Sequence, residues 1–314
     1  MQRLRQIIAV LFAVGCSAGA PLSAWAQQPA AAPSGDSVLV LGRISDDPKA
    51  HYDQLRPLLD YVVPRMADVG IREGRVLMAR DPQQMASYLR RGRVDWVTET
   101  AGTAMLLRQR AGAEPLLLTE RGGHSHYRSV FFVRRDSDIR ALSQMRGHSV
   151  AFQRPSSTSA YFVPAAALLA HDIQLEILLS PHDRTDAAEV GYLFARSELN
   201  IATWVHKGLV DVGVMSDLDW NNPARMPLAF RDDLVVFERT WEFPRAVEVV
   251  RGGLDPRVRA RLYQVLAEAA SDPAAAGALR QFFGTTQFLP VDAASARSLE
   301  RIAAGVARVR GEVE

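Results

Sequence analysis

The chain has 314 residues, of which 48% are hydrophobic and 23% are charged, and its formal net charge is +2. This composition is typical of a soluble globular protein with a large core, in one or two domains. Arg3 and Arg5 precede the predicted start of the mature chain. Without them, the mature chain has 35 basic and 35 acidic side chains. An even balance of charge gives no reason to expect nucleic acid or a membrane surface as a partner.

Residues 1–26 are predicted to be a secretory signal peptide. They combine the basic start with an apolar stretch from Ile7 to Val14, and they end in the small-residue pattern of Ala24 and Ala26. The apolar stretch is too short for a membrane-spanning helix, which needs about 20 residues. We therefore expect a periplasmic protein in which residues 27–37, rich in Pro, Ala and Ser, form a disordered leader.

The single cysteine, Cys16, lies inside this predicted signal peptide. A mature chain that starts after Ala26 would contain no cysteine and could form no disulfide. Lipidation of Cys16 is the alternative to its removal. Removal is favoured because Ala13, rather than a large aliphatic residue, stands three positions before the cysteine.

From residue 38 onward, apolar runs of strand length alternate with longer segments of helical period. This order predicts an α/β fold with largely parallel sheets. Strands are expected at residues 38–44, 75–79, 94–98, 115–119, 129–134, 149–152, 174–179, 210–215 and 233–237. Helices are expected at residues 50–69, 82–91, 101–111, 139–145, 160–171, 199–207, 255–271, 273–283 and 292–310.

Two segments of the chain, 88–97 and 204–213, repeat one sequence pattern. Each passes from a helix through Gly-x-Val-Asp into an apolar strand, which places Asp95 and Asp211 where the strands begin. Aspartate is unfavourable in strands, so each carboxylate either faces solvent, caps a neighbouring element or serves a ligand. The repeat predicts two lobes built alike, with their strand ends turned toward a common cleft.

The segment FQRPSSTSAYFVP, residues 152–164, places four hydroxyl side chains between two prolines where a strand gives way to a helix. The start of a helix has unpaired N–H groups and a partial positive charge, and hydroxyls would add neutral donors for an oxyanion. Serine and threonine are also favoured in an ordinary capped loop. The residues alone leave both interpretations open for Ser156, Ser157, Thr158 and Ser159.

Residues 127–169 resemble the periplasmic solute-binding proteins of ABC importers for phosphonate, phosphite and related phosphorus oxyanions. The matching pieces are Tyr127 before Ser-Val, the phrase RRDSDIRALSQMRGHSVAF, the triplet 157–159 between two prolines, and HKGLVDVGV at 206–214. The resemblance implies a two-lobed periplasmic-binding-protein-like fold with a ligand cleft between the lobes. Residues 38–122 plus 239–314 would form lobe one, and residues 123–238 would form lobe two.

The same resemblance implies that Ser157, Thr158 and Ser159 grip the oxyanion and that Tyr127 and Asp211 line the cleft. The sequence also departs from the family pattern. Arg154 replaces an aspartate and Ala160 a glycine, Pro82 replaces the tyrosine of aminophosphonate binders, and Glu198 and Asn200 stand in the segment where many members have a histidine.

These departures affect which charge the bound ligand would carry. If Arg154 points into the cleft, its guanidinium favours a more anionic guest; if it points outward, it is an ordinary surface residue. Both orientations remain open. The carboxylates of Glu99, Glu198 and Asp211 would suit a protonated or amine-bearing guest.

We expect a monomeric binding protein that captures a small oxyanion and delivers it to an ABC transporter permease, without a cofactor, a metal or catalysis. The alternative within the same fold is a sensor that presents its closed form to a membrane signalling partner. A serine hydrolase would need Ser157 or Ser159 beside His182 or His206 and Asp211, but the mature chain has no nucleophile elbow. His124 and His126 lack a third metal ligand at suitable spacing.

Overall fold

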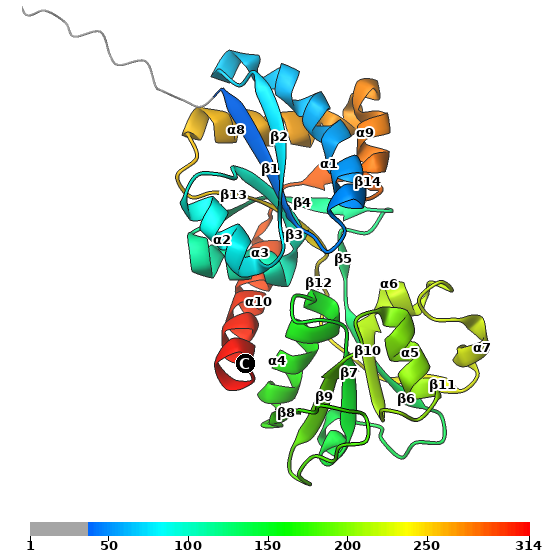
Figure 1. Cartoon of the computed structure of the whole chain (residues 1–314). Coiled ribbons are helices and arrows are strands. Elements are labelled where there is room, and N and C mark those ends of the chain that lie inside the picture. Colours follow the sequence, from blue (N-terminus) through cyan, green and yellow to red (C-terminus); the bar gives the residue numbers. More distant parts are fainter. Residues whose placement is uncertain (1–36) are drawn as a thin grey trace, which may run out of the picture. The chain divides into compact units, whose positions relative to one another are not determined.

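The computed structural model describes residues 37–314. The predicted signal peptide, Cys16 and all but the last residue of the expected leader lie outside the described residues. Within residues 37–314 the chain forms two six-stranded sheets and one two-stranded sheet, surrounded by helices (Figure 1). No helix in this range is both long enough and apolar enough to cross a membrane.

Lobe one is built on a sheet of order β14-β4-β13-β3-β1-β2. β1 pairs in parallel with β2 and β3, whereas β13 is antiparallel to both β3 and β4. The strands are β1 (Val38–Ile44), β2 (Glu73–Ala79), β3 (Trp96–Thr100), β4 (Glu114–Arg121), β13 (Ala246–Val250) and β14 (Thr285–Leu289). The helices are α1 (Pro48–Val62), η1 (Val63–Val69), α2 (Pro82–Arg90), α3 (Ala101–Ala111), α8 (Pro256–Glu268), η4 (Ala269–Ser271), η5 (Pro273–Ala275), α9 (Ala276–Gln281) and α10 (Ala293–Glu312).

Lobe two is built on a sheet of order β11-β6-β10-β7-β9-β8. β7 is parallel to β9 and β10, and β6 is antiparallel to β10 and β11. The strands are β6 (Ser129–Arg134), β7 (Ser149–Phe152), β8 (Leu175–Ile177), β9 (Val190–Phe194), β10 (Val212–Ser216) and β11 (Leu234–Arg239). The helices are η2 (Leu142–Met145), η3 (Thr158–Phe162), α4 (Val163–Ala170), α5 (Glu198–His206), α6 (Asp217–Trp220) and α7 (Leu228–Arg231).

The chain crosses between the two sheets twice, and the two crossings pair with each other. β5 (His126–Tyr127) lies on the way from β4 to β6, and β12 (Phe243–Pro244) lies on the way from β11 to β13. The two short strands form an antiparallel pair, with Phe243 opposite Tyr127. The expected lobe limits at residues 122 and 239 stay a prediction, but the paired crossings mark where a hinge would act.

The helix α10 makes a further connection between the lobes. It packs against α3 of lobe one and against α4 of lobe two, and Figure 1 shows it (red) beside α4. A Cβ atom at Gly305 would lie 3.0 Å from the Cβ of Ala166, so the small residues allow a close approach of the two helices. One buried apolar cluster accordingly contains residues of α3, α4 and α10.

The predicted α/β fold with two lobes is confirmed, but the sequence pattern missed five strands. These are the two-residue strands β5 and β12 and the longer strands β9, β13 and β14. In β13 the apolar run is broken by Glu248, and β14 begins with polar residues, so neither gave a strand signal. The expectation of largely parallel sheets is wrong for lobe one because β13 runs antiparallel between β3 and β4. The helix expected at 139–145 is a single short turn.

Glu248 is fully buried in the middle of β13 because neighbouring strands satisfy its carboxylate. Its Oε2 accepts a hydrogen bond of 2.6 Å from the Trp96 indole, and its Oε1 accepts from the hydroxyls of Thr98 at 2.7 Å and Thr119 at 2.5 Å. Burial raises the pKa of Glu248, while these hydrogen bonds and the charge of Arg121 oppose the rise. A charged residue is tolerated in a central strand here because its partners are built into the sheet.

We predict that Glu248→Ala lowers the free energy of unfolding by about 3–5 kcal/mol, because it leaves the buried donors of Trp96, Thr98 and Thr119 without an acceptor. Denaturant unfolding measures this loss. The control is Glu176→Ala, which removes an exposed carboxylate from the edge strand β8 and should change stability by less than about 0.5 kcal/mol. Equal effects of the two substitutions would contradict the structural role of Glu248.

Candidate ligand-binding site

The hydroxyl run begins an irregular helix at the carboxyl end of β7. Ser157 is the N-cap of η3, and its Oγ accepts a hydrogen bond of 3.2 Å from the amide of Ala160. η3 is a π-type turn that leads into α4. Ala160, inside this turn, has non-helical dihedral angles. Pro164 lies in the first turn of α4, where a missing N–H is tolerated. Both Thr158 and Ser159 are buried.

The start of η3 meets the start of α3 from lobe one. The hydroxyl of Thr158 accepts a buried hydrogen bond of 2.8 Å from the amide of Gly102, and the hydroxyl of Thr103 donates to the carbonyl of Ser156 at 3.1 Å. A Cβ atom at Gly102 would lie 2.8 Å from the Thr158 oxygen, so only glycine fits without a shift. Two positive helix ends, one from each lobe, therefore converge here.

No carboxylate neutralises either helix end through a cap. The first turn of α3 contains no acidic residue, and among the described residues its N-cap side chain, Thr100, makes no capping hydrogen bond. The N-cap of η3 is the neutral Ser157, and its first turn is also free of acidic residues. An anion placed between the two ends would interact favourably with both.

Tyr127 joins this region from the crossing strand β5. Its ring is buried and packs edge-on against Phe243, with ring centroids 4.9 Å apart. Burial raises the pKa of Tyr127 to about 12, although the nearby Ser159 hydroxyl acts in the opposite direction. The phenol is therefore protonated at neutral pH and can donate a hydrogen bond from the hinge.

Two of the predicted carboxylates already have partners. Glu99, buried at the end of β3, accepts a hydrogen bond of 3.0 Å from the amide of Ile44 and lies 3.9 Å from the Arg43 guanidinium. Glu198, at the start of α5, accepts from the Gln153 amide at 2.6 Å and lies 3.8 Å from the Arg225 guanidinium.

The environment of Glu198 also changes its acidity. Burial raises the pKa of Glu198, and the nearby Asp219 adds to the rise. This carboxyl group therefore holds a proton at a higher pH than an ordinary glutamate. Its protonation would remove one negative charge from this side of lobe two.

Arg154 points across to lobe one. Its guanidinium forms an ion pair of 2.8 Å with Asp46, which follows β1, and the two side chains are 44% and 70% exposed. Burial alone would raise the pKa of Asp46, but the attraction and hydrogen bond of Arg154 lower it. Arg154 thus forms a contact between the lobes, and this contact is exposed to solvent.

The structure does not bring Asp211 to this region. The residue precedes β10, where its Oδ2 accepts hydrogen bonds from the amide of Ser149 at 2.8 Å and from the Ser149 hydroxyl at 2.9 Å. Because β10 and β7 are parallel, Asp211 lies at the amino ends of the strands, opposite to the hydroxyl run. The expectation that Asp211 lines the cleft is therefore wrong, because its side chain lies at the opposite edge of the sheet.

Asp95, the matching residue of lobe one, serves the same purpose as Asp211. Its Oδ2 accepts a hydrogen bond of 2.9 Å from the amide of Val40 in β1, and its Oδ1 pairs with Arg251 at 2.8 Å. The repeated Gly-x-Val-Asp pattern thus marks an aspartate that accepts a hydrogen bond from an amide of the adjacent parallel strand. It indicates two similar lobes, but not a shared ligand site.

In the described residues, His206 and Asp211 have partners other than those that the hydrolase alternative requires. His206 lies 3.3 Å from Asp233 and stacks on Phe230, and Asp211 lies 3.5 Å from His148. Within residues 37–314 there is no group of three side chains suited to a metal ion.

Sequence reasoning missed Gly102 and Thr103 as members of the site. The signal was present, because the segment WVTETAGTA has the same form as the hydroxyl run: a buried strand followed by small and hydroxyl residues at a helix start. Asp46 and Gln153 were also missed. Both carry polar side chains just beyond the carboxyl ends of β1 and β7, where ligands of α/β sheets bind.

We predict that Asp95→Ala lowers the free energy of unfolding by about 2–3 kcal/mol, but Asp211→Ala by only about 1 kcal/mol. The Asp95 side chain is 9% exposed and would leave Arg251 unpaired, whereas the Asp211 side chain is 46% exposed. Denaturant unfolding of both variants tests the order. A larger loss for Asp211→Ala would contradict it.

Comparison with known proteins identifies relatives over most of the chain. The sequence profile of the family "ABC transporter, phosphonate, periplasmic substrate-binding protein" matches residues 42–296. The structure is similar to that of XAC2383 from Xanthomonas citri bound to chloride ion, with 57% identity, a TM-score of 0.85, and coverage of 88% of this chain and 100% of that one. The same protein bound to ATP matches with 56% identity and a TM-score of 0.84, over 89% of this chain and 100% of that one.

A more distant similarity shows the fold alone. PhnD1 from Prochlorococcus marinus, in complex with methylphosphonate, matches with 16% identity and a TM-score of 0.62. The match covers 87% of this chain and 99% of that chain.

Proposed function

Because this chain belongs to the periplasmic substrate-binding proteins of phosphonate ABC transporters, we propose that it captures a small phosphorus oxyanion for import. The guest would be a phosphonate, a phosphite or a phosphate ester. The family acts outside the cytoplasm with a transporter as its partner. Secretion through a cleaved signal peptide at residues 1–26 and action as a monomer are part of the proposal.

The contact between Gly102 and Thr158 is the observation that carries the proposal. A buried main-chain amide at one positive helix end is satisfied by a neutral hydroxyl at the other. The oxygen of a phosphorus oxyanion is a stronger acceptor than a hydroxyl, because hydrogen bonds to charged groups are roughly twice as strong as neutral ones. An entering oxyanion could therefore replace the Thr158 oxygen at this amide and receive the Thr158 hydroxyl as a donor.

The remaining donors of the proposed site are neutral as well. The other donors are the hydroxyls of Ser157 and Ser159 at the start of η3 and the phenol of Tyr127, which lies beside Ser159, whereas the Thr103 hydroxyl already donates to a carbonyl. Ser156 contributes through its carbonyl, which positions Thr103. Neutral donors of this kind can hold an oxyanion without a lysine.

The carboxylates near the proposed site are already paired with arginines, which favours a ligand without an amine. Glu99 lies beside Arg43, Glu198 beside Arg225, and Asp46 beside Arg154. An ammonium group on the guest would have to compete with a guanidinium for each of these carboxylates. A phosphonate, phosphite or phosphate ester without an amine requires no such exchange.

The proposed mechanism is closure of the lobes about the β5 and β12 pair. Residues 38–122 plus 239–314 would turn against residues 123–238 and bring the two helix starts together. The Arg154 to Asp46 ion pair spans the lobes, but as an exposed pair it would stabilise the closed form by only about 0–1 kcal/mol. The guest would supply most of the preference for closure.

Phosphate esters are candidate ligands because the similar protein XAC2383 from Xanthomonas citri was solved with bound ATP. Adenosine triphosphate presents the same tetrahedral phosphorus oxyanion on a larger body. One phosphate group of ATP would bind between the start of α3 and the start of η3.

We predict that at least one of phosphate, phosphite, methylphosphonate, aminoethylphosphonate and ATP raises the melting temperature, whereas sulfate gives a smaller rise. A guest at 100 times its Kd adds about 2.7 kcal/mol of stability, equivalent to a rise of roughly 5–10 °C. A thermal-shift panel measures this, with calorimetric titration for the Kd. No response to any phosphorus oxyanion would contradict the proposal.

The site is tested by the double variant Ser157→Ala with Thr158→Ala, which should abolish the response. Circular dichroism checks that this variant folds, and Gly102→Ala gives a second test because its methyl group would push against Thr158. The matched control is Asp211→Ala, which should keep the Kd within about twofold because its contacts lie at the other end of the strands. An unchanged Kd in the double variant would place the guest elsewhere.

A further inference from the structure

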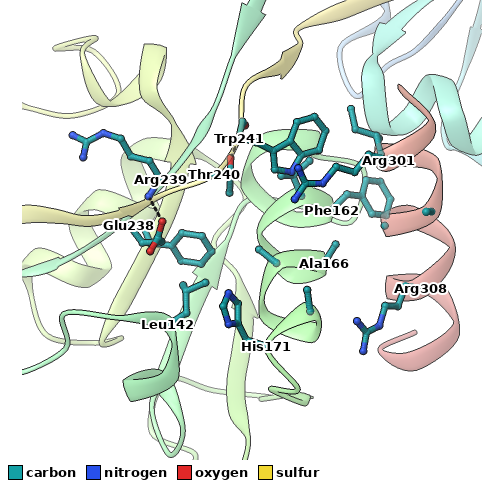
Figure 2. A pocket seen from close by; sticks show the side chains of 17 residues that line it. Leu142, Phe162, Ala166, His171, Glu238, Arg239, Thr240, Trp241, Arg301 and Arg308 are labelled. Atoms are coloured by element: carbon teal, nitrogen blue, oxygen red, sulfur yellow. Dashed lines mark hydrogen bonds between the residues drawn. The ribbon is translucent and has the colours of Figure 1, made fainter. Parts of the chain in front are cut away.

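A cavity lies between α4 and α10, and Gly102, Thr158 and Ser159 of the proposed oxyanion site do not line it. Its volume is about 420 Å³, which is in the range of small-molecule sites. Its walls come from α4, α10, the end of β11 and the crossing residues Thr240 and Trp241 (Figure 2).

The cavity exists because the facing surfaces of the two helices are built from small residues. Ala166, Ala167 and Ala170 of α4 face Ala304 and Gly305 of α10 along it. The helices touch at Ala166 and Gly305, and the missing side-chain volume beside this contact remains open.

The rest of the wall is apolar and aromatic. Phe131, Leu142, Phe162 and Trp241 contribute their side chains, so a flat or aliphatic body would displace water from apolar surface on several sides. Walls of this kind with a few polar groups are typical of small-molecule sites.

The rim of the cavity is cationic on the side of α10. The Arg301 guanidinium lies over the Trp241 ring, 4.5 Å from its centroid, and Figure 2 shows Arg301 and Arg308 extending from α10 toward α4. Arg308 pairs with Glu312, whereas no ion pair among residues 37–314 involves Arg301. Glu238 is the one carboxylate in the wall, and it accepts a hydrogen bond from the amide of Arg239.

We propose that this cavity binds a small organic monoanion with an apolar body, such as an aryl or alkyl carboxylate. The body would lie among the aromatic side chains, and the carboxylate would pair with Arg301 beside the ring of Trp241. An arginine that is stacked on an aromatic ring is held in place, so it loses little freedom when it binds a carboxylate.

The position of the cavity couples it to the arrangement of the lobes. α10 also packs on α3 of lobe one, and Thr240 and Trp241 belong to the second crossing between the sheets. The closure proposed above would move α4 relative to α3, so a ligand held between α10, α4 and this crossing would contact parts of both lobes. Its binding therefore favours one arrangement of the lobes over another.

The test is calorimetric titration of the purified protein with phenylacetate, indole-3-acetate, benzoate and hexanoate. At least one carboxylate should bind with a Kd below about 1 mM, and its neutral amide should bind at least ~10-fold more weakly. Absence of saturable binding by all four, or equal binding of the amide, would overturn the proposal.

Two substitutions locate the binding. Arg301→Gln should weaken binding of the carboxylate about 10-fold and that of the amide little, and Ala167→Leu should weaken both by filling the cavity. The matched control is Arg297→Gln, an exposed arginine one turn earlier on α10, which should bind as the unaltered protein does. An unchanged Kd in both Arg301→Gln and Ala167→Leu would show that the carboxylate binds elsewhere.

The two proposals, the oxyanion site and the carboxylate site, can be tested independently of each other. The double variant Ser157→Ala with Thr158→Ala should retain carboxylate binding, and Arg301→Gln should retain the response to phosphorus oxyanions. Loss of carboxylate binding in the Ser-Thr variant, when it is folded, would assign the carboxylate to the oxyanion site and overturn the second site alone.

Discussion

The arrangement of the two lobes depends on the amide of Gly102, which must find an acceptor where α3 begins. In this structure the acceptor is the hydroxyl of Thr158 from the other lobe. A buried amide without a partner would cost about 1–3 kcal/mol, so this hydrogen bond favours an arrangement in which Thr158 lies against the start of α3. Under the proposed function, an oxyanion would replace the hydroxyl as the acceptor, and ligand binding would then use the same amide as the contact between the lobes.

Much of the architecture could be predicted from local pattern. The alternation of apolar runs and helical segments gave the α/β class, and the four hydroxyls between prolines indicated the start of a helix. These predictions succeeded because they depend on neighbours in the sequence, such as the cap that Ser157 provides for the amide of Ala160.

The features that failed depend on partners distant in the sequence. Glu248 sits in a central strand only because Trp96, Thr98 and Thr119 arrive from other strands to satisfy it. Asp211 was assigned to the cleft, but parallel pairing with β7 places it at the amino end of the sheet. A single sequence shows the residue but not the register, and the register decides which edge of the sheet a side chain reaches.

The position of α10 limits how far the lobes can be treated as separate folding units. Each lobe has its own sheet, yet the apolar cluster that contains α4 is completed by a helix at the far end of the chain. A fragment of residues 123–238 would keep the six strands of its sheet apart from Arg239 at the end of β11, but it would expose the alanine-rich side of α4 to water. Apart from the pairing near the crossings, each lobe forms its own sheet, but the two lobes share buried apolar surface, so such a fragment would be prone to self-association.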